Sequence, residues 1–328
     1  MQTLAVVVPA YNESEGLREF HARLAAVFDT LTEFACSVLY VDDGSRDDTW
    51  AVMQSLAAAD ARVATLKLSR NFGKELALTA GIDHADADAV IVIDADLQDP
   101  PELIPKFIQT WREGYDIVYG TRSTRAGESG IKKFTAAAFY RVMERLSATP
   151  VPRDTGDFRL MSRRAVDALK QLRERQRFMK GLFAWVGFPQ AAIVYDRDPR
   201  FAGASKFNYW RLWNFALEGI TSFSGAPLKI ATYIGVATAL LAFVFGLIVM
   251  TKALLFGDAV RGYPSLMVVI LFLGGVQLMA LGMIGEYLGR LYVESKQRPL
   301  YLIEQYRSAK PAAEAARNPR TADTPPLR

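Results

Sequence analysis

Cysteine and histidine are scarce in this chain of 328 residues. Cys36 is its single cysteine, and His21 and His84 are its two histidines. One cysteine excludes an intramolecular disulfide, and it excludes the zinc and iron–sulfur sites that are built on cysteine clusters. Two histidines are too few for a histidine-rich metal centre. A metal ion used by this chain would therefore be held by oxygen ligands.

Two phosphate-binding signatures are also absent. No G-x-G-x-x-G follows the first apolar run at residues 4–8, and the chain contains no G-x-x-x-x-G-K-[ST]. These absences exclude a dehydrogenase-type dinucleotide site and a P-loop. The formal net charge of +4 is only mildly basic. Such a charge favours anionic membrane or phosphate partners over nucleic acid.

Long apolar runs occur only in the C-terminal third. Residues 228–250 contain one charge, Lys229 at the edge, and residues 266–284 contain none. Each run reaches the ~20 residues that a membrane helix needs. We therefore expect a transmembrane hairpin across residues 227–292. A content of 51% hydrophobic and 23% charged residues fits a chain that is part soluble and part membrane-embedded.

The flanking segments predict the orientation of this hairpin. Basic residues stand before the first run and after the second, and few lie between them. By the positive-inside rule, we expect the N-terminal part and both termini to face the cytoplasm of a multi-pass protein of the inner (plasma) membrane. No N-terminal signal peptide is expected that would oppose this. Residues 206–226 mix aromatic and basic residues, which indicates a helix in the headgroup layer or an amphipathic core helix. We expect residues 293–328 to form a cytoplasmic tail that is disordered from about residue 309.

Strand-like and helix-like segments alternate through the first 120 residues. Continuous apolar runs predict strands at residues 4–8, 37–41, 63–68, 89–93 and 117–119, with helices at 16–30, 48–59, 74–87 and from Pro100 onward. Such runs are typical of parallel strands buried on both faces. The pattern predicts an α/β domain with a mostly parallel sheet over residues 1–205. Ligands of such sheets bind beyond the carboxyl ends of the strands.

Polar motifs follow three of the expected strands: PAYNE at residues 9–13, DDGS at 42–45 and DADLQD at 94–99. Carboxylates do not bind phosphate directly, but they hold divalent cations that bind a diphosphate. Asp94, Asp96 and Gln98 supply oxygen ligands on one side of an extended turn. A D-x-D alone is common by chance. Here the D-x-D ends the apolar strand AVIVID and comes after a DDGS motif that ends an earlier strand, and this combination is specific. Asp42 and Asp43 could instead form a turn and a helix cap.

The strings VVPAYNE, VDDGS and IDADLQDPPE together resemble the family 2 glycosyltransferases with the GT-A fold. Later strings resemble the polyprenyl-phosphate glycosyltransferases, in particular the bactoprenol glucosyltransferases, which are related to the dolichyl-phosphate mannosyltransferases. These strings include SRNFGKELAL, GDFRLMSR, RFMKG, GASKF, WNFALEGITSFS, FGDAVRGYPSL and GEYLGR. The resemblance covers roughly residues 4–302. It implies inverting transfer of a sugar, with UDP-glucose the favoured donor, to undecaprenyl or another polyprenyl phosphate at the cytoplasmic membrane face.

The resemblance also implies roles for individual residues. Mg²⁺ or Mn²⁺ would be held by Asp94, Asp96 and Gln98. Asp96 and Asp157 would be the catalytic carboxylates, and Asp157 could act as a base, orient the sugar or pair with Arg159. The nucleotide-sugar site would be formed by Pro9, Tyr11, Glu13, Asp42, Asp43, Asp94, Ala95, Asp96 and Gln98.

The acceptor phosphate needs cationic partners, because it is an anion at neutral pH. An arginine or lysine near it could bind this phosphate, or could form part of a solvated basic face that attracts anionic lipid. The candidates are Arg122, Lys132, Lys133, Arg197, Arg200 and Lys206. Arg122 and Lys206 stand in motifs that match the family.

Several alternatives stay open. A processive polysaccharide synthase would carry a Q-x-x-R-W motif and more spans, and the stretch Gln176-Arg177-Phe178 lacks that pattern. The donor could be GDP-mannose or UDP-aminoarabinose, and a non-catalytic membrane scaffold is a rival of another class. Expected partners are a nucleotide diphosphate sugar, polyprenyl phosphate and membrane lipids, with no nucleic acid. A downstream flippase and glycosyltransferase are also expected, and a homo-oligomer is left open.

Overall fold

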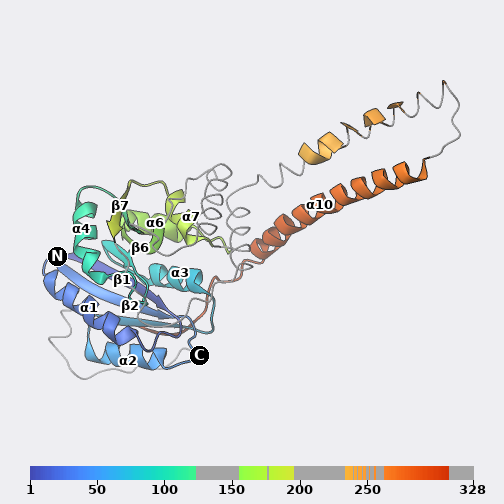
Figure 1. Ribbon diagram of the computed structural model, residues 1–328. Helices are drawn as coiled ribbons and strands as arrows, with labels where there is room; N and C mark the ends of the chain where they lie inside the picture. The colour runs from blue at the N-terminus through green and yellow to red at the C-terminus, as the bar shows by residue number, and fades with distance from the viewer. Residues whose placement is uncertain are drawn as a thin grey trace. The chain divides into compact units, whose positions relative to one another are not determined.

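The computed structural model describes residues 1–122, 155–175, 177–195 and 262–309, together with scattered residues between 233 and 255 (Figure 1). The chain divides into two compact units, which are described separately. The first contains the described residues up to 195 and those from 299 onward. The second contains the described residues between 233 and 298.

An eight-stranded sheet forms the centre of the first unit, with the strand order β7-β5-β6-β4-β1-β2-β3-β8. Strands β4, β1, β2 and β3 are parallel neighbours, and β5 is parallel to β7. Strand β6 lies antiparallel between β4 and β5, and β8 pairs antiparallel with β3. The mostly parallel sheet expected from the sequence is thus confirmed. The strands are β1 (Gln2–Ala10), β2 (Phe34–Asp42), β3 (Val63–Leu68), β4 (Ala89–Val92), β5 (Ile117–Arg122), β6 (Thr155–Ser162), β7 (Gln190–Tyr195) and β8 (Ile303–Arg307).

Helices cover both faces of this sheet. Helices α1, α2 and α4 share one hydrophobic core with the sheet, whereas α3 and α6 contact each other and pack on the sheet elsewhere. Their apolar spacing explains the packing: in α1 the buried residues Leu17, Phe20, Leu24, Val27 and Phe28 recur every three or four positions. The helices are α1 (Leu17–Thr30), α2 (Thr49–Ala59), α3 (Lys74–His84), α4 (Ile104–Arg112, after a 3-10 turn at Pro101–Leu103), α6 (Arg163–Gln171) and α7 (Met179–Trp185).

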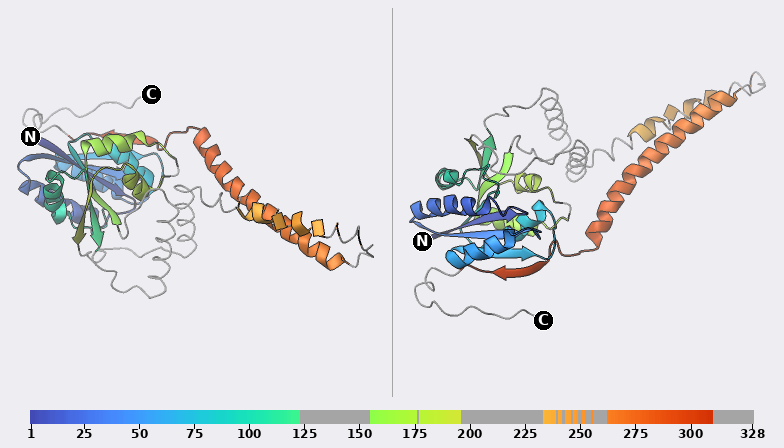
Figure 2. Two further views of the ribbon diagram at one scale, coloured as in Figure 1. Left: turned by 90° about the horizontal axis from the view of Figure 1, so that it is seen from above. Right: turned by 60° about the horizontal axis from the view of Figure 1, so that its bottom comes forward.

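The C-terminal strand β8 is the main departure from expectation. Residues 303–307 were expected in a tail outside the α/β domain of residues 1–205, but they pair with β3 at the edge of its sheet (Figure 2). Main-chain hydrogen bonding explains this, because a polar segment can pair with an exposed strand edge without any apolar run of its own. Residues beyond 309 and the juxtamembrane segment 206–226 lie outside the described residues.

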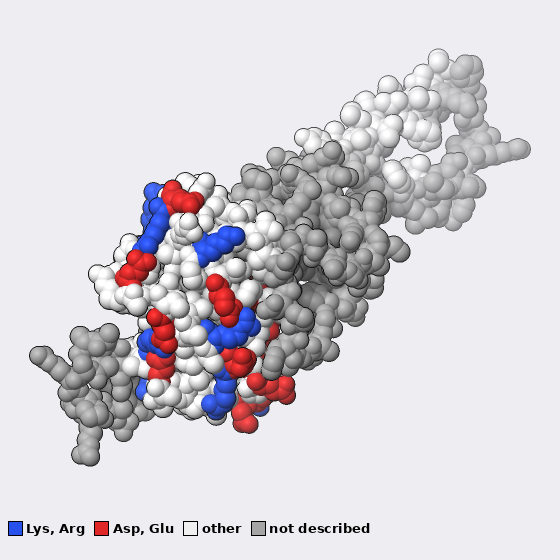
Figure 3. Space-filling model, turned by 60° about the vertical axis from the view of Figure 1, so that its left-hand side comes forward, with Lys and Arg blue, Asp and Glu red and all other residues white. Residues whose placement is uncertain are grey.

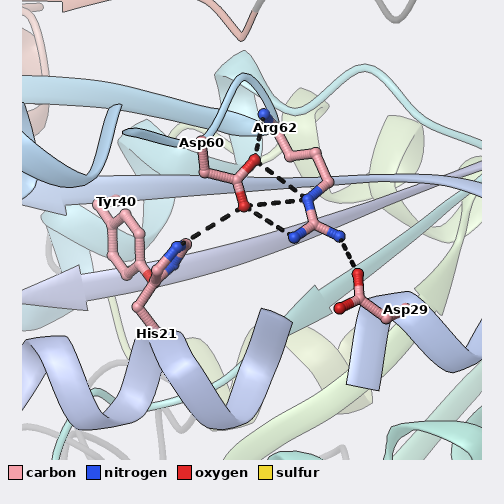
Figure 4. A network of polar contacts seen from close by, with 5 residues as sticks. All are labelled: His21, Asp29, Tyr40, Asp60 and Arg62. Carbon is pink, nitrogen blue, oxygen red and sulfur yellow. Dashed lines mark hydrogen bonds and ion pairs between the residues drawn. The ribbon is translucent and has the colours of Figure 1, made fainter. Parts of the chain in front are cut away.

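A partly buried polar network fastens α1 to β2, to the end of α2 and to the start of β3 (Figure 4). The Nδ1 atom of His21 lies 3.0 Å from the Tyr40 hydroxyl, and its Nε2 atom lies 3.7 Å from Asp60. Arg62 pairs with Asp60 and Asp29, each at 2.8 Å. Burial lowers the pKa of His21, and the charge of Arg62 adds to this, against the opposing effect of Asp60.

Charged side chains of both signs are interleaved on the face of the first unit shown in Figure 3. Among the described residues drawn there, neither sign forms a large patch. Mixed charge of this kind is typical of a solvated protein surface.

In the second unit, helix α10 (Tyr263–Ser295) is 33 residues long and carries Pro264 in its first turn, where the missing N–H of proline has no cost. Within it, residues 272–295 contain an 18-residue window with a mean hydropathy of 1.2 and are long and apolar enough to cross a membrane. No other described helix meets both criteria, although Tyr233–Phe245 is a shorter apolar helical stretch. The expected span at residues 266–284 therefore lies inside α10, and the first half of the expected hairpin is described only in part.

Candidate active site

The strand-end motifs that the sequence analysis selected gather at one edge of the sheet. Strands β1, β2 and β4 are parallel, so their carboxyl ends meet there. Strand β6 runs in the opposite direction, so its first residues reach the same edge. This arrangement brings Asp157 from β6 beside the DADLQD motif that follows β4, although the two are far apart in the sequence.

The loops after β1 and β2 are joined by hydrogen bonds. The Asn12 N–H donates to Ser45 Oγ at 3.0 Å, and Asn12 Oδ1 accepts from the Arg46 N–H at 2.9 Å. The Glu13 N–H donates to Thr49 Oγ1 at 2.9 Å. Tyr11, which directly precedes Asn12, is 39% exposed. The loop that carries PAYNE and the loop that carries DDGS are thus held together beside an accessible aromatic ring, which suits stacking against a nucleobase.

Asp43 and Gly44 hold the loop that precedes α3. The two carboxylate oxygens of Asp43 accept hydrogen bonds from the N–H groups of Phe72 (2.7 Å) and Gly73 (2.9 Å). Gly44 has φ +67°, and a Cβ there would lie 2.5 Å from the carbonyl carbon of Arg70. Burial raises the pKa of Asp43, while the two backbone N–H groups lower it. In this structure Asp43 positions residues 70–73, and its expected nucleoside contact stays a prediction.

Asp42 makes a local turn and keeps one oxygen unused. Its Oδ1 atom accepts from the Ser45 N–H at 3.0 Å, as in the turn considered as its alternative role. Its Oδ2 atom is buried and has no hydrogen-bond partner. A buried acceptor without a partner is costly, so this oxygen is suited to a ligand donor.

Lys74, the first residue of α3, connects two acidic residues of the site. Its Nζ atom lies 2.7 Å from Asp94 Oδ2 and 2.5 Å from Asp157 Oδ2. The sequence analysis did not select Lys74. One signal was present in SRNFGKELAL, because a lysine directly after glycine at a helix start opposes the helix dipole.

The charges in this cluster fix its protonation. Desolvation lowers the pKa of Lys74, but the carboxylates of Asp94 and Asp157 outweigh it and raise that pKa. Burial would raise the pKa of Asp157, but the charges of Lys74 and Lys180 hold it well below its usual range. Burial raises the pKa of Asp94 despite the attraction of Lys74. Asp157 is therefore an anion at neutral pH, and a weak base.

Two further ionisable residues lie near Asp157. Glu75 accepts a hydrogen bond from the Met179 N–H at 3.0 Å, and burial together with the charge of Asp157 raises its pKa to about 7. Arg159 is 4% exposed, lies 3.6 Å from the centre of the Phe183 ring, and donates to the carbonyl oxygen of Asp157. The suggested pairing of Arg159 with Asp157 thus occurs through the backbone oxygen.

The oxygens of the DADLQD motif fit a divalent cation. Asp94 Oδ1 and Gln98 Oε1 are buried and have no hydrogen-bond partner, while Asp96 Oδ1 accepts from the Gln98 N–H at 3.2 Å. The described residues contain no group of three or more His, Cys, Asp or Glu side chains able to hold a metal. Two carboxylates and an amide form a partial donor set, as is usual for Mg²⁺ sites that substrate phosphates complete.

Tyr195 links the ends of β7 and β5 to the same motif. Its hydroxyl donates a hydrogen bond to Asp99 Oδ1. A Cβ at Gly120 on β5 would lie 2.6 Å from the Tyr195 ring, so glycine is needed for this approach. Arg122 is in register with Tyr195, which brings its backbone to the same edge. The side chain of Arg122 and the acceptor candidates Lys132, Lys133, Arg197, Arg200 and Lys206 lie outside the described part.

The sequence places this site in a known family. Residues 5–170 match the family described as Glycosyl transferase family 2, and residues 226–291 match the GtrB C-terminal hairpin. The chain belongs to glycosyltransferase family 2. The resemblance drawn from the motifs is thus confirmed, and the protein is a glycosyltransferase.

Family 2 relatives match nearly the whole chain. A glycosyltransferase of Synechocystis described as uncharacterized is 54% identical over 92% of this chain and 94% of its own. A bactoprenol glucosyl transferase of Shigella phage SfV is 48% identical over 92% and 98%, respectively. A prophage bactoprenol glucosyl transferase homolog of Escherichia coli is 47% identical over 92% and 98%.

Proposed function

We propose that this glycosyltransferase moves glucose from UDP-glucose to undecaprenyl or another polyprenyl phosphate, with inversion at the anomeric carbon. The names of the Shigella phage and Escherichia coli relatives support the acceptor and the sugar. The observation that carries the proposal is the contact of Lys74 with both Asp94 and Asp157. It joins the donor-side motif to a second carboxylate on another strand.

The donor half of the reaction follows from the two loops and the DADLQD motif. The exposed Tyr11 ring and the unused Asp42 oxygen would bind the nucleoside. Asp94, Asp96 and Gln98 would hold Mg²⁺ or Mn²⁺, which when bound neutralises the charge that develops on a departing diphosphate. A diphosphate held by these residues would lie near Lys74, which also contacts Asp157.

The acceptor half needs no strong base. A phosphate oxygen forms the new bond to the anomeric carbon, and the electron pair of the breaking bond leaves with the diphosphate. The acceptor is already ionised near neutral pH, since phosphoesters have a second pKa of about 6. Asp157 has a pKa well below its usual range, so we assign it the role of orienting the sugar rather than of removing a proton.

The membrane position follows from the acceptor. A polyprenyl phosphate presents its phosphate at the headgroup layer, and the apolar part of α10 and the matched hairpin would anchor the enzyme beside it. We place the catalytic unit and both termini in the cytoplasm, in agreement with the basic flanks of the apolar runs. A flippase and a second glycosyltransferase would act on the lipid-linked product.

The proposal is tested with purified full-length protein, undecaprenyl phosphate and a panel of UDP- and GDP-sugars, with the lipid product identified by mass. We expect a lipid-linked hexose with UDP-glucose. Product from GDP-mannose or UDP-aminoarabinose alone would overturn the donor assignment. Absence of any product would support a non-catalytic scaffold. An Asp157→Asn variant serves as the inactive control on the same fold.

A further inference from the structure

The two carboxylate oxygens of Asp94 differ in their surroundings. Oδ2 is 2.7 Å from the Lys74 ammonium, whereas Oδ1 is buried and has no hydrogen-bond partner. The same ammonium is 2.5 Å from Asp157 Oδ2. Two carboxylates so close to one nitrogen would repel each other strongly without it. Lys74 thus supplies positive charge at the place where a cation-bound diphosphate is expected.

Hydrogen bonds fix the backbone just before Lys74, while the Lys74 side chain is about half exposed. Asp43 fixes the N–H groups of Phe72 and Gly73 immediately before it. The Lys74 side chain itself is 48% exposed, and a flexible four-carbon stem carries its ammonium. A cation at the start of a helix is disfavoured by the helix dipole. The two carboxylates compensate for this cost, and the exposed stem leaves the ammonium able to move.

We propose that Lys74 is an internal counter-ion that occupies Asp94 while the donor is absent and releases it when the cation-bound diphosphate arrives. Lys74 then stays on Asp157. This inference rests on the proposed function, since it assumes a nucleotide diphosphate donor. Lys74 acts here as a positioning residue. A divalent cation alone binds poorly, because the ammonium already neutralises Asp94 and repels a second positive charge.

The test measures Mn²⁺ binding by the full-length protein in detergent, from the electron paramagnetic resonance signal of free Mn²⁺, with and without UDP. Without UDP, we expect Lys74→Met and Lys74→Gln to bind Mn²⁺ about tenfold more tightly than wild type, since a repelling unit charge is removed at close range. Lys74→Arg keeps the charge and should bind as wild type does. Lys106→Met, which removes an exposed lysine on α4, should change nothing. With UDP present, the difference between wild type and Lys74→Met should shrink.

The direction of the change separates this role from damage to the fold, because a misfolded site would bind Mn²⁺ less tightly. Equal or weaker Mn²⁺ binding by the two charge-removing variants without UDP would overturn the proposal. Failure of both to fold would also overturn it, since a displaceable counter-ion cannot be essential for folding. Failure of the wild-type protein to transfer any sugar would instead count against the proposed function and leave the Mn²⁺ comparison valid.

Discussion

The hydroxyl of Tyr301 donates a hydrogen bond to Asp83 Oδ2 at 2.9 Å. Tyr301 follows α10 closely in the chain, and Asp83 lies near the end of α3, the helix that begins with Lys74. The adjacent Leu302 accepts a hydrogen bond from the Ser69 N–H at 2.9 Å, just before the loop that Asp43 holds. The segment after the apolar helix therefore contacts both the far end of α3 and the start of its preceding loop.

Removing the Tyr301 hydroxyl should weaken this attachment. Asp83 is only 10% exposed and keeps its ion pair with Arg173 at 2.7 Å, so Tyr301→Phe loses one hydrogen bond, worth about 1 kcal/mol. We expect Tm to fall by about 2–4 °C, measured by thermal unfolding of the purified protein. Tyr115→Phe, at an exposed position, is the matched control and should leave Tm unchanged. An unchanged Tm for Tyr301→Phe would show that this contact is dispensable.

Asp43 should matter for stability as well as activity. Asp43→Ala leaves the N–H groups of Phe72 and Gly73 without their acceptors, and we expect a loss of about 2–4 kcal/mol in the free energy of unfolding. The loss is measured by urea denaturation. Asp48→Ala is the control, because Asp48 precedes α2 without a side-chain capping hydrogen bond. Wild-type stability of Asp43→Ala, with a defect in UDP binding only, would assign Asp43 to the nucleoside alone.

The network around His21 should make stability depend on pH. Burial lowers the pKa of His21 in the folded state, so folding favours the neutral imidazole over the charged one. This contribution is complete above the unfolded pKa of about 6.5 and is lost as the pH falls below it. We expect the urea concentration at the unfolding midpoint to decrease as the pH is lowered from 7.5 to 5.5. This decrease should be smaller in His21→Gln. An equal decrease in His21→Gln would show that other titrating groups cause the pH dependence. His84→Gln is the control for the loss of an imidazole elsewhere in the protein.

Sugar transfer should require a divalent cation. Asp94, Asp96 and Gln98 are the proposed metal ligands of the DADLQD motif, and two of them have buried oxygens without hydrogen-bond partners. Excess chelator should abolish product formation, and added Mg²⁺ or Mn²⁺ should restore it. Asp96→Ala should not be restored by either ion. Full turnover in excess chelator would contradict this prediction.

Truncation should separate the sheet from the membrane anchor. Deleting residues 228–328 also removes β8, so we expect a less stable domain that binds UDP weakly. In a second variant, a flexible linker joins residue 227 to residues 299–309, so that β8 is restored without the apolar helices. This variant should regain stability and UDP binding. Both should glycosylate membrane-embedded polyprenyl phosphate poorly, because anchoring raises the effective concentration of the acceptor. The loss should be smaller for a short, water-soluble prenyl phosphate. Equal activity of truncated and full-length protein on the embedded acceptor would show the anchor to be dispensable.

Sequence patterns predicted the elements that depend on local signals. Strands β1 to β5 were found because each contains a buried apolar run, and the DADLQD motif because its oxygens are spaced two residues apart. Strand β6 carries the buried Arg159, and β8 is exposed throughout, so neither has an apolar alternation that marks a strand. Lys74 was missed because its role arises only where α3, β4 and β6 converge.

The pairing of β3 with β8 has a consequence for biosynthesis. The ion pair between Lys67 and Glu304 joins residues 237 positions apart, and the apolar helix α10 is translated before the second of them. During synthesis, β3 therefore emerges from the ribosome long before β8, its partner at the edge of the sheet, has been translated. A strand edge left unpaired is prone to pair with other chains. Because β8 is synthesised after α10, β3 and β8 can pair only after the apolar helix has been translated.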